Sequence, residues 1–159
     1  MNKSNFETMT ALVVDDEPMM RVLLKGLLQE IGFGKIMEAE DGAAALALLD
    51  DSHHIDIVIC DLEMPIIGGL EFVGMLRKSD TLYDSRVPVI IVTGHSEQSN
   101  IQEAVRLGIH GFLVKPFSRT NLQNQIVRAL DRPAIDLKKL APKKRDFTEV
   151  EVLDFNQKK

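Results

Sequence analysis

Five polar residues each follow an apolar run of the sequence, and together they could carry out phosphoryl chemistry. They are Asp15 and Asp16 after the first run, Asp61 after the third, Thr93 after the fourth and Lys115 after the fifth. Clustered carboxylates repel, at a cost on the order of 4 kcal/mol for two charges about 4 Å apart at an effective dielectric near 20. Mg²⁺, which prefers oxygen ligands, would remove that cost. A carboxylate beside a metal and a lysine can attack phosphorus, and a threonine hydroxyl can bind a phosphoryl oxygen.

The apolar runs alternate with segments of helical spacing, which predicts an α/β fold. The predicted strands are 11–14, 36–39, 55–60, 87–92 and 111–114. Short uninterrupted runs of this kind are typical of a parallel sheet covered on both faces, with right-handed crossovers. Ligands bind beyond the carboxyl ends of such strands, so we expect the five polar residues to share one edge of the sheet.

Helix ends are also marked in the sequence. Pro18 suits the first turn of a helix, and Gly32 and Gly34 should stop that helix. Asp41 and Ser118 are placed to cap the second and the last helices through their side-chain oxygens. These signals mark the first, second and last helices, and they therefore support the alternation of strands and helices.

Composition limits the class of protein. The 159 residues are 45% hydrophobic and 27% charged, which suits one soluble domain. The net charge of -5 argues mildly against a general nucleic-acid binder, and we expect no direct DNA binding. Cys60 is the single cysteine, so it forms no internal disulfide, and a buried thiol suits a reducing cytoplasm. We see neither a signal peptide nor a membrane span, and we expect a cytoplasmic protein.

The chain changes character after residue 131. We expect a core domain over 10–131 and a charged extension over 132–159, which contains two prolines and the basic cluster 143–145. The extension has the composition of a solvated tail, although it could pack on the domain, a dimer partner or a target. It is too short for a helix-turn-helix or a catalytic output domain, so we expect no separate output domain.

Four motifs carry a resemblance to a known family. They are Val13-Val14-Asp15-Asp16-Glu17, Asp61-Leu62-Glu63-Met64-Pro65, Val92-Thr93-Gly94 and Lys115-Pro116-Phe117. Over about residues 10–130 the sequence resembles the receiver domains of two-component response regulators, of the single-domain chemotaxis (CheY-like) type. The resemblance implies a doubly wound, flavodoxin-like (βα)5 fold whose five parallel strands have the order 2-1-3-4-5.

The resemblance also implies a role for each acid. Asp61 would be the phosphoacceptor. Asp16 would bind Mg²⁺ (or Mn²⁺) directly, and Asp15 mainly through water. Glu63 would supply its backbone carbonyl to the metal. The protein would be a phosphoacceptor that catalyses only its own phosphorylation and dephosphorylation, and not otherwise an enzyme.

Further residues would bind the phosphoryl group and report on it. Lys115 would pair with the phosphoryl group, and the Lys115–Pro116 peptide would be cis. Thr93 and Phe112 would form a switch pair; the family has Tyr or Phe at the position of Phe112, so no tyrosine hydroxyl acts here. Glu63 and His95 lie two residues past Asp61 and Thr93, where the resemblance implies an influence on phosphate lifetime.

The implied phosphodonor is a histidine kinase or a histidine phosphotransfer protein. A downstream protein target would bind the surface formed by the fourth helix, the fifth strand and the fifth helix, roughly 97–130. We expect a monomer or a weak, phosphorylation-dependent dimer.

Other functions fit the sequence less well. A phosphorelay intermediate or phosphate sink would use the same residues without a target of its own. A haloacid-dehalogenase-like phosphatase expects Asp-x-Asp after the first strand, where this chain has Asp15-Asp16-Glu17. A flavodoxin would need a hydroxyl- and glycine-rich phosphate loop at the same place. A receiver-like module that only binds protein would not need the full set of acidic, Thr and Lys residues.

Overall fold

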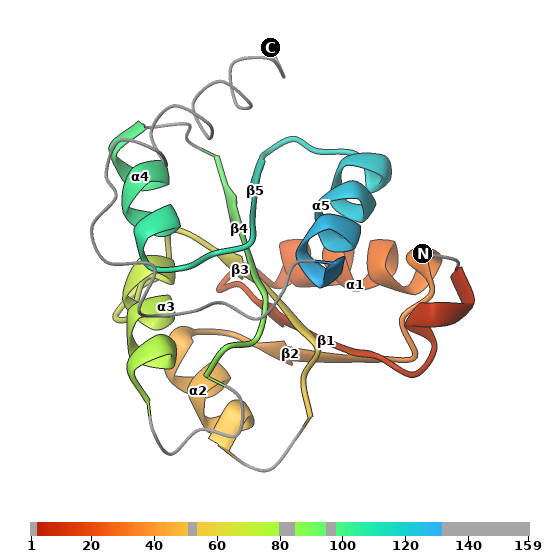
Figure 1. The fold of residues 1–159 in the computed structure, drawn as a ribbon, viewed down its shortest axis with the longest axis horizontal. Coiled ribbons are helices and arrows are strands. Elements are labelled where there is room, and N and C mark those ends of the chain that lie inside the picture. Colours follow the sequence, from red (N-terminus) through yellow and green to blue (C-terminus); the bar gives the residue numbers. More distant parts are fainter. Residues whose placement is uncertain (1–2, 51–53, 80–84, 95–97, 132–159) are drawn as a thin grey trace.

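A five-stranded parallel sheet forms the centre of the computed structural model, which describes residues 3–50, 54–79, 85–94 and 98–131 (Figure 1). The strands are β1 (Thr10–Val14), β2 (Lys35–Ala39), β3 (Ile57–Asp61), β4 (Val89–Thr93) and β5 (Gly111–Val114). Their order is β2-β1-β3-β4-β5, and every adjacent pair is parallel. The predicted fold class and strand order are therefore confirmed.

Helices cover both faces of the sheet (Figure 1). One face carries α1 (Pro18–Ile31), α5 (Arg119–Asp131) and the short 3-10 helix η1 (Lys3–Phe6). The other face carries α2 (Gly42–Asp50), α3 (Gly69–Lys78) and α4 (Gln98–Arg106). Within the described residues, no helix is long and apolar enough to span a bilayer.

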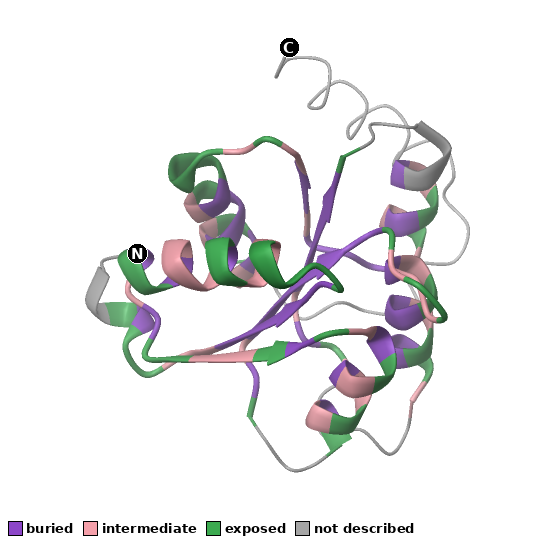
Figure 2. Ribbon diagram, turned by 180° about the vertical axis from the view of Figure 1, so that it is seen from behind, coloured by how far each residue is buried: buried purple, intermediate pink, exposed green. Residues whose placement is uncertain are grey.

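Two hydrophobic cores explain why the strands are apolar at successive positions. In β1, Leu12 and Val14 belong to the core shared with α2, α3 and α4. Ala11 and Val13 belong to the core shared with α1 and α5. Successive side chains of a strand point to opposite faces, so a sheet covered on both sides needs apolar residues throughout. Figure 2 shows the result: β1, β3 and β4 are buried between helices that are exposed on their outer sides, and the edge strand β2 is partly exposed.

The predicted helix ends are present. Gly32 ends α1 with φ 120°, and its N–H donates to the carbonyl of Leu28 at 3.0 Å. The Asp41 carboxylate accepts a hydrogen bond of 2.7 Å from the N–H of Ala44. The Ser118 hydroxyl accepts one of 3.0 Å from the N–H of Asn121. A glycine at positive φ and two side-chain oxygens thus set these boundaries.

Two strands begin two residues later than the sequence predicted. Before β3, Asp56 accepts a hydrogen bond on its carboxylate from the N–H of Thr10 at 2.7 Å, and its own N–H donates to the Thr10 carbonyl at 2.9 Å. Before β4, Pro88 has no N–H to donate, and its carbonyl accepts from the N–H of Val58 at 2.9 Å. In both places the apolar run begins two residues before the regular strand does, so the predicted bounds were wrong there.

Candidate functional site

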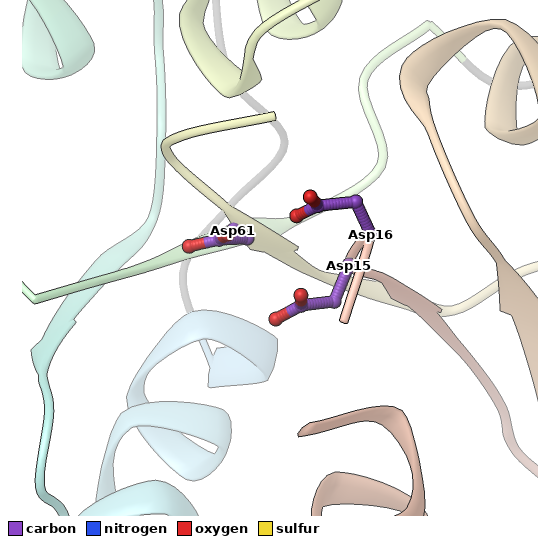
Figure 3. Close-up of side chains that lie close together, drawn as sticks. All are labelled: Asp15, Asp16 and Asp61. Carbon is purple, nitrogen blue, oxygen red and sulfur yellow. The ribbon is translucent and has the colours of Figure 1, made fainter. Parts of the chain in front are cut away.

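Three carboxylates lie together where β1 and β3 end (Figure 3). Asp15, Asp16 and Asp61 can each offer one oxygen, and the three oxygens lie within 4.8 Å of one another. The strands are adjacent and parallel, with Val14 opposite Cys60, so the residues that follow reach the same edge of the sheet. The expected meeting of these acids at one edge is therefore observed.

Asp15 has one satisfied and one unsatisfied carboxylate oxygen. Its Oδ1 accepts the N–H of Glu17 at 2.9 Å. Its Oδ2 is buried and has no hydrogen-bond partner in the described part of the chain. A buried carboxylate oxygen without a partner is costly, and a divalent cation is one group that would satisfy it. The three acids thus fit a Mg²⁺ site in charge, atom type and proximity.

Lys115 brings a positive charge to the same place from the end of β5. Its Nζ lies 3.4 Å from Oδ1 of Asp61 and 4.0 Å from Oδ2 of Asp15. Its backbone N–H donates to the carbonyl of Thr93 at 2.8 Å, which ties the ends of β4 and β5 together. The peptide bond between Lys115 and Pro116 is cis. The residue that follows β5 therefore places an ammonium group close to Asp61 and Asp15.

The electrostatics oppose full ionisation of Asp15 and Asp61. Burial raises the pKa of Asp61 to about 6; the negative charge of Asp15 adds to this rise, and Lys115 opposes it. Burial also raises the pKa of Asp15, while the hydrogen bond from the N–H of Glu17 lowers it. Because both carboxylates carry a penalty when charged, a cation that binds their ionised forms would relieve it.

Gly69 allows α3 to begin directly beside Asp61. A Cβ atom at this position would lie 2.4 Å from the carbonyl oxygen of Asp61, closer than real Cβ contacts. The N–H of Gly69 donates to the carbonyl of Leu62 at 2.9 Å. This steric requirement for glycine appears only once α3 is folded back against the end of β3.

The other predicted site residues lie at different depths. Thr93 is fully buried at the end of β4, one residue past Val92, the partner of Asp61 in the sheet. Phe112 is buried in the core shared with α2, α3 and α4. Glu63 is exposed. His95 lies outside the described residues.

One contact near the site had no signal in the sequence. The guanidinium of Arg21 on α1 donates from Nη1 to the backbone carbonyl of Asp15 at 2.7 Å and lies 3.5 Å from Glu38 on β2. It therefore holds the backbone of Asp15 from the α1 side. Its spacing of six residues from Asp15 corresponds to no regular helical contact, because the loop between them lies outside the helix.

Mg²⁺ is expected to raise the melting temperature of the protein. A ligand at one hundred times its Kd stabilises the folded state by about 2.7 kcal/mol, a shift of roughly 5–10 °C for a chain of this size. Asp16→Asn should lose most of the shift, because it removes one of the three oxygen donors. Asp50→Asn, at an exposed carboxylate at the end of α2, should keep it. Thermal unfolding with and without MgCl₂ measures this, and equal shifts in all three proteins would contradict the site.

Comparisons with known proteins agree with this geometry. The family model described as "Response regulator receiver domain" matches residues 11–127. The Chemotaxis protein CheY of Pseudomonas aeruginosa is 35% identical over 124 residues, covering 78% of this chain and 98% of that protein. Chemotaxis protein CheY-3 of Vibrio cholerae is 32% identical over 126 residues, covering 79% and 95%. The structure of Vibrio cholerae CheY4 has a TM-score of 0.68 at 31% identity and covers 77% of this chain and 98% of that one. This chain belongs to the family of response regulator receiver domains.

Proposed function

We propose that this receiver accepts a phosphoryl group on Asp61 from a histidine kinase or a histidine phosphotransfer protein. The observation that carries the proposal is the position of Asp61, whose Oδ1 lies 3.4 Å from the Lys115 ammonium and whose carboxylate clusters with those of Asp15 and Asp16. A nucleophile, a counter-charge and a set of metal ligands thereby meet at one point. Nothing else among the described residues combines these three functions.

In the transfer step, a carboxylate oxygen of Asp61 attacks phosphorus on the donor's phosphohistidine. The new P–O bond forms as the P–N bond breaks, and the electron pair of the P–N bond stays on the donor's imidazole nitrogen. Lys115 neutralises negative charge on the transferred oxygens. A Mg²⁺ ion held by Asp15, Asp16, Asp61 and the backbone carbonyl of Glu63 would supply further charge neutralisation when bound. Attack of water on the same phosphorus would release inorganic phosphate and restore the Asp61 carboxylate.

Thr93 and Phe112 would report that the site is phosphorylated. Moving a two-state equilibrium from 1:99 to 99:1 takes about 5.5 kcal/mol, whereas a hydrogen bond to a charged group contributes about 1.5–3 kcal/mol. Thr93 alone is therefore insufficient, and Lys115 and a repacking of Phe112 must contribute. The signal would pass to a protein target through the surface of α4, β5 and α5. These elements belong to a receiver domain over residues 10–131, with 132–159 as an extension.

Thr93→Ala is expected to accept phosphate and respond weakly. The variant keeps the nucleophile and the metal ligands, so its labelling rate should stay within about tenfold of wild type, since one hydrogen bond is lost. Its structural response should fall more. Chemical shifts of backbone amides in α4 and β5, compared with and without beryllofluoride, measure the response. A full response in Thr93→Ala would remove Thr93 from the switch.

The proposed function is tested by labelling the protein with ³²P-acetyl phosphate. We expect label to form only with MgCl₂ and not when EDTA is present during the reaction. Hydroxylamine should release the label, as it releases an acyl phosphate. Label that resists hydroxylamine would indicate a different modified group, and absence of label under all conditions would refute the proposal.

A further inference from the structure

The helix α1 carries apolar side chains on two opposite sides. Its inner side packs against the sheet through buried residues of the hydrophobic core. On its outer side, Met19, Val22 and Leu23 are 80%, 66% and 49% exposed, and they are three of the five exposed large hydrophobic residues in the part of the chain that the structure describes. Spacings of three and four residues place these side chains together on the helix surface. A helix that is apolar on both sides is typical of one that is covered on both sides.

The neighbouring helix α5 has a different outer side. α1 and α5 lie on the same face of the sheet, and Arg119 of α5 forms an ion pair of 3.7 Å with Glu30 of α1 (Figure 1). Every exposed residue of α5 is polar. Adjoining exposed apolar side chains on a soluble protein mark a site of interaction. The outer side of α1 therefore has the character of a surface that another segment covers.

Gly26 continues the exposed apolar row of α1, four residues past Val22 and three past Leu23. A Cβ atom at this position would have no heavy atom within 4 Å outside its own helical segment, so no neighbour among the described residues requires a glycine. Glycine inside a helix is destabilising relative to alanine, and it suits a place where another segment approaches closely. We call Met19, Val22, Leu23 and Gly26 the α1 stripe.

The extension after α5 contains a segment whose chemistry suits the α1 stripe. Residues 147–155 combine five apolar residues with three acids, which are Phe147, Val150, Val152, Leu153 and Phe155, and Glu149, Glu151 and Asp154. Lys25 borders the stripe one turn past Val22, and Lys25 and Arg21 share the single acid Glu38, each at 3.5 Å. These three residues carry one excess positive charge, which attracts an acidic segment. Earlier apolar residues of the extension lie beside Lys138 and Lys139, so charge favours 147–155.

The chain between α5 and this segment is long enough for it to reach the stripe. Residues 132–146 can span about 50 Å when extended. α1 has 14 residues and is therefore about 21 Å long. A segment tethered by a linker of this kind has an effective concentration in the mM range, so a weak contact suffices to hold it. A second copy of the protein at micromolar concentration has no such advantage.

We propose that residues 147–155 dock on the α1 stripe, with an aromatic side chain packed over Gly26. The chain then covers its own exposed apolar surface, and the acids of the segment lie near Arg21 and Lys25. This contact goes beyond the proposed function and does not depend on phosphorylation of Asp61.

A nitroxide label on the extension tests the proposal through paramagnetic broadening of NMR signals. Cys60 is the single cysteine and is fully buried, so the reagent attaches to the introduced residue in Gln157→Cys. We expect strong broadening of the backbone amides of residues 19–26. Amides around Met75, an exposed apolar residue of α3 on the opposite face of the sheet, should stay sharp.

Substitutions in the labelled protein separate apolar docking from mere proximity. Leu23→Gln should weaken the docking equilibrium by about fivefold, because one partly exposed apolar contact is lost, and broadening on α1 should fall with it. Met75→Gln is the matched control, since its side chain is 45% exposed compared with 49% for Leu23, and it should leave the broadening unchanged. Phe147→Ser combined with Phe155→Ser should abolish the broadening on α1.

Three results would overturn the proposal. One is a lack of broadening on α1, or equal broadening on α1 and α3. Another is broadening of α1 in a mixture of ¹⁵N-labelled wild type and unlabelled protein that carries the nitroxide, which would assign the stripe to a second copy. The third is full broadening in Leu23→Gln and in the double phenylalanine variant, which would show that the extension lies near α1 without using the apolar contact.

Discussion

Asp61→Asn is expected to abolish phosphoryl labelling, by at least about a thousandfold, because loss of a nucleophile removes the bond-forming atom itself. The amide has nearly the shape of the carboxylate, so it should leave the fold intact. Asp61 is also the acid that lies 3.4 Å from Lys115, whereas Asp15 lies 4.0 Å away. The measurement is incorporation of ³²P from acetyl phosphate in the presence of MgCl₂.

Asp50→Asn is the matched control, since it makes the same chemical change at an exposed acid outside the cluster. It should label at the wild-type rate. Residual labelling of Asp61→Asn at more than a few per cent of wild type would mean that Asp15 or Asp16 can act as acceptor, and Asp61 would no longer be the unique phosphorylation site.

The same variant is expected to be more stable than wild type near neutral pH when no divalent cation is present. The pKa of Asp61 is raised from 3.8 to about 6, first by burial and then by the charge of Asp15. Between these two values the folded state binds more protons than the unfolded state, so stability falls as pH rises. A rise of about two pKa units corresponds to about 3 kcal/mol. Asn carries no charge and escapes this loss.

Urea unfolding in EDTA at about pH 4 and about pH 7 measures the difference. The gain of Asp61→Asn over wild type should reach about 3 kcal/mol near pH 7 and shrink toward pH 4, where wild-type Asp61 is protonated in the folded state. Saturating MgCl₂ should stabilise wild type much more than the variant. A wild type that is as stable as the variant in EDTA at pH 7 would show that the ionised Asp61 carboxylate carries no such penalty.

The strands that position the site, and the acids at their carboxyl ends, could be predicted from the sequence. Apolar runs that end on acids predict strands whose carboxyl ends carry Asp15, Asp16 and Asp61, and parallel pairing brings these ends to one edge. The caps at Asp41 and Ser118 depend only on neighbours along the chain. The order 2-1-3-4-5 came from the family resemblance, because strand periodicity does not say which strands are neighbours.

Features that depend on long-range contacts could not be predicted in this way. β3 begins two residues later than predicted. This later start depends on hydrogen bonds between Asp56 and Thr10, which are far apart in the sequence. The unsatisfied Oδ2 of Asp15 and the requirement for glycine at position 69 appear only when neighbouring elements pack. Nothing in the sequence predicts the positive φ of Ile66, since isoleucine is among the residues least expected at positive φ.

The central claim, phosphorylation of Asp61, is tested most directly by locating the modified residue. Wild-type protein is incubated with acetyl phosphate and MgCl₂, reduced with borohydride to convert an aspartyl phosphate to the corresponding alcohol, and mapped by tandem mass spectrometry. We predict homoserine at position 61 and unmodified aspartate at positions 15 and 16. Reduction at either of those two positions, or at none of the three, would contradict the account.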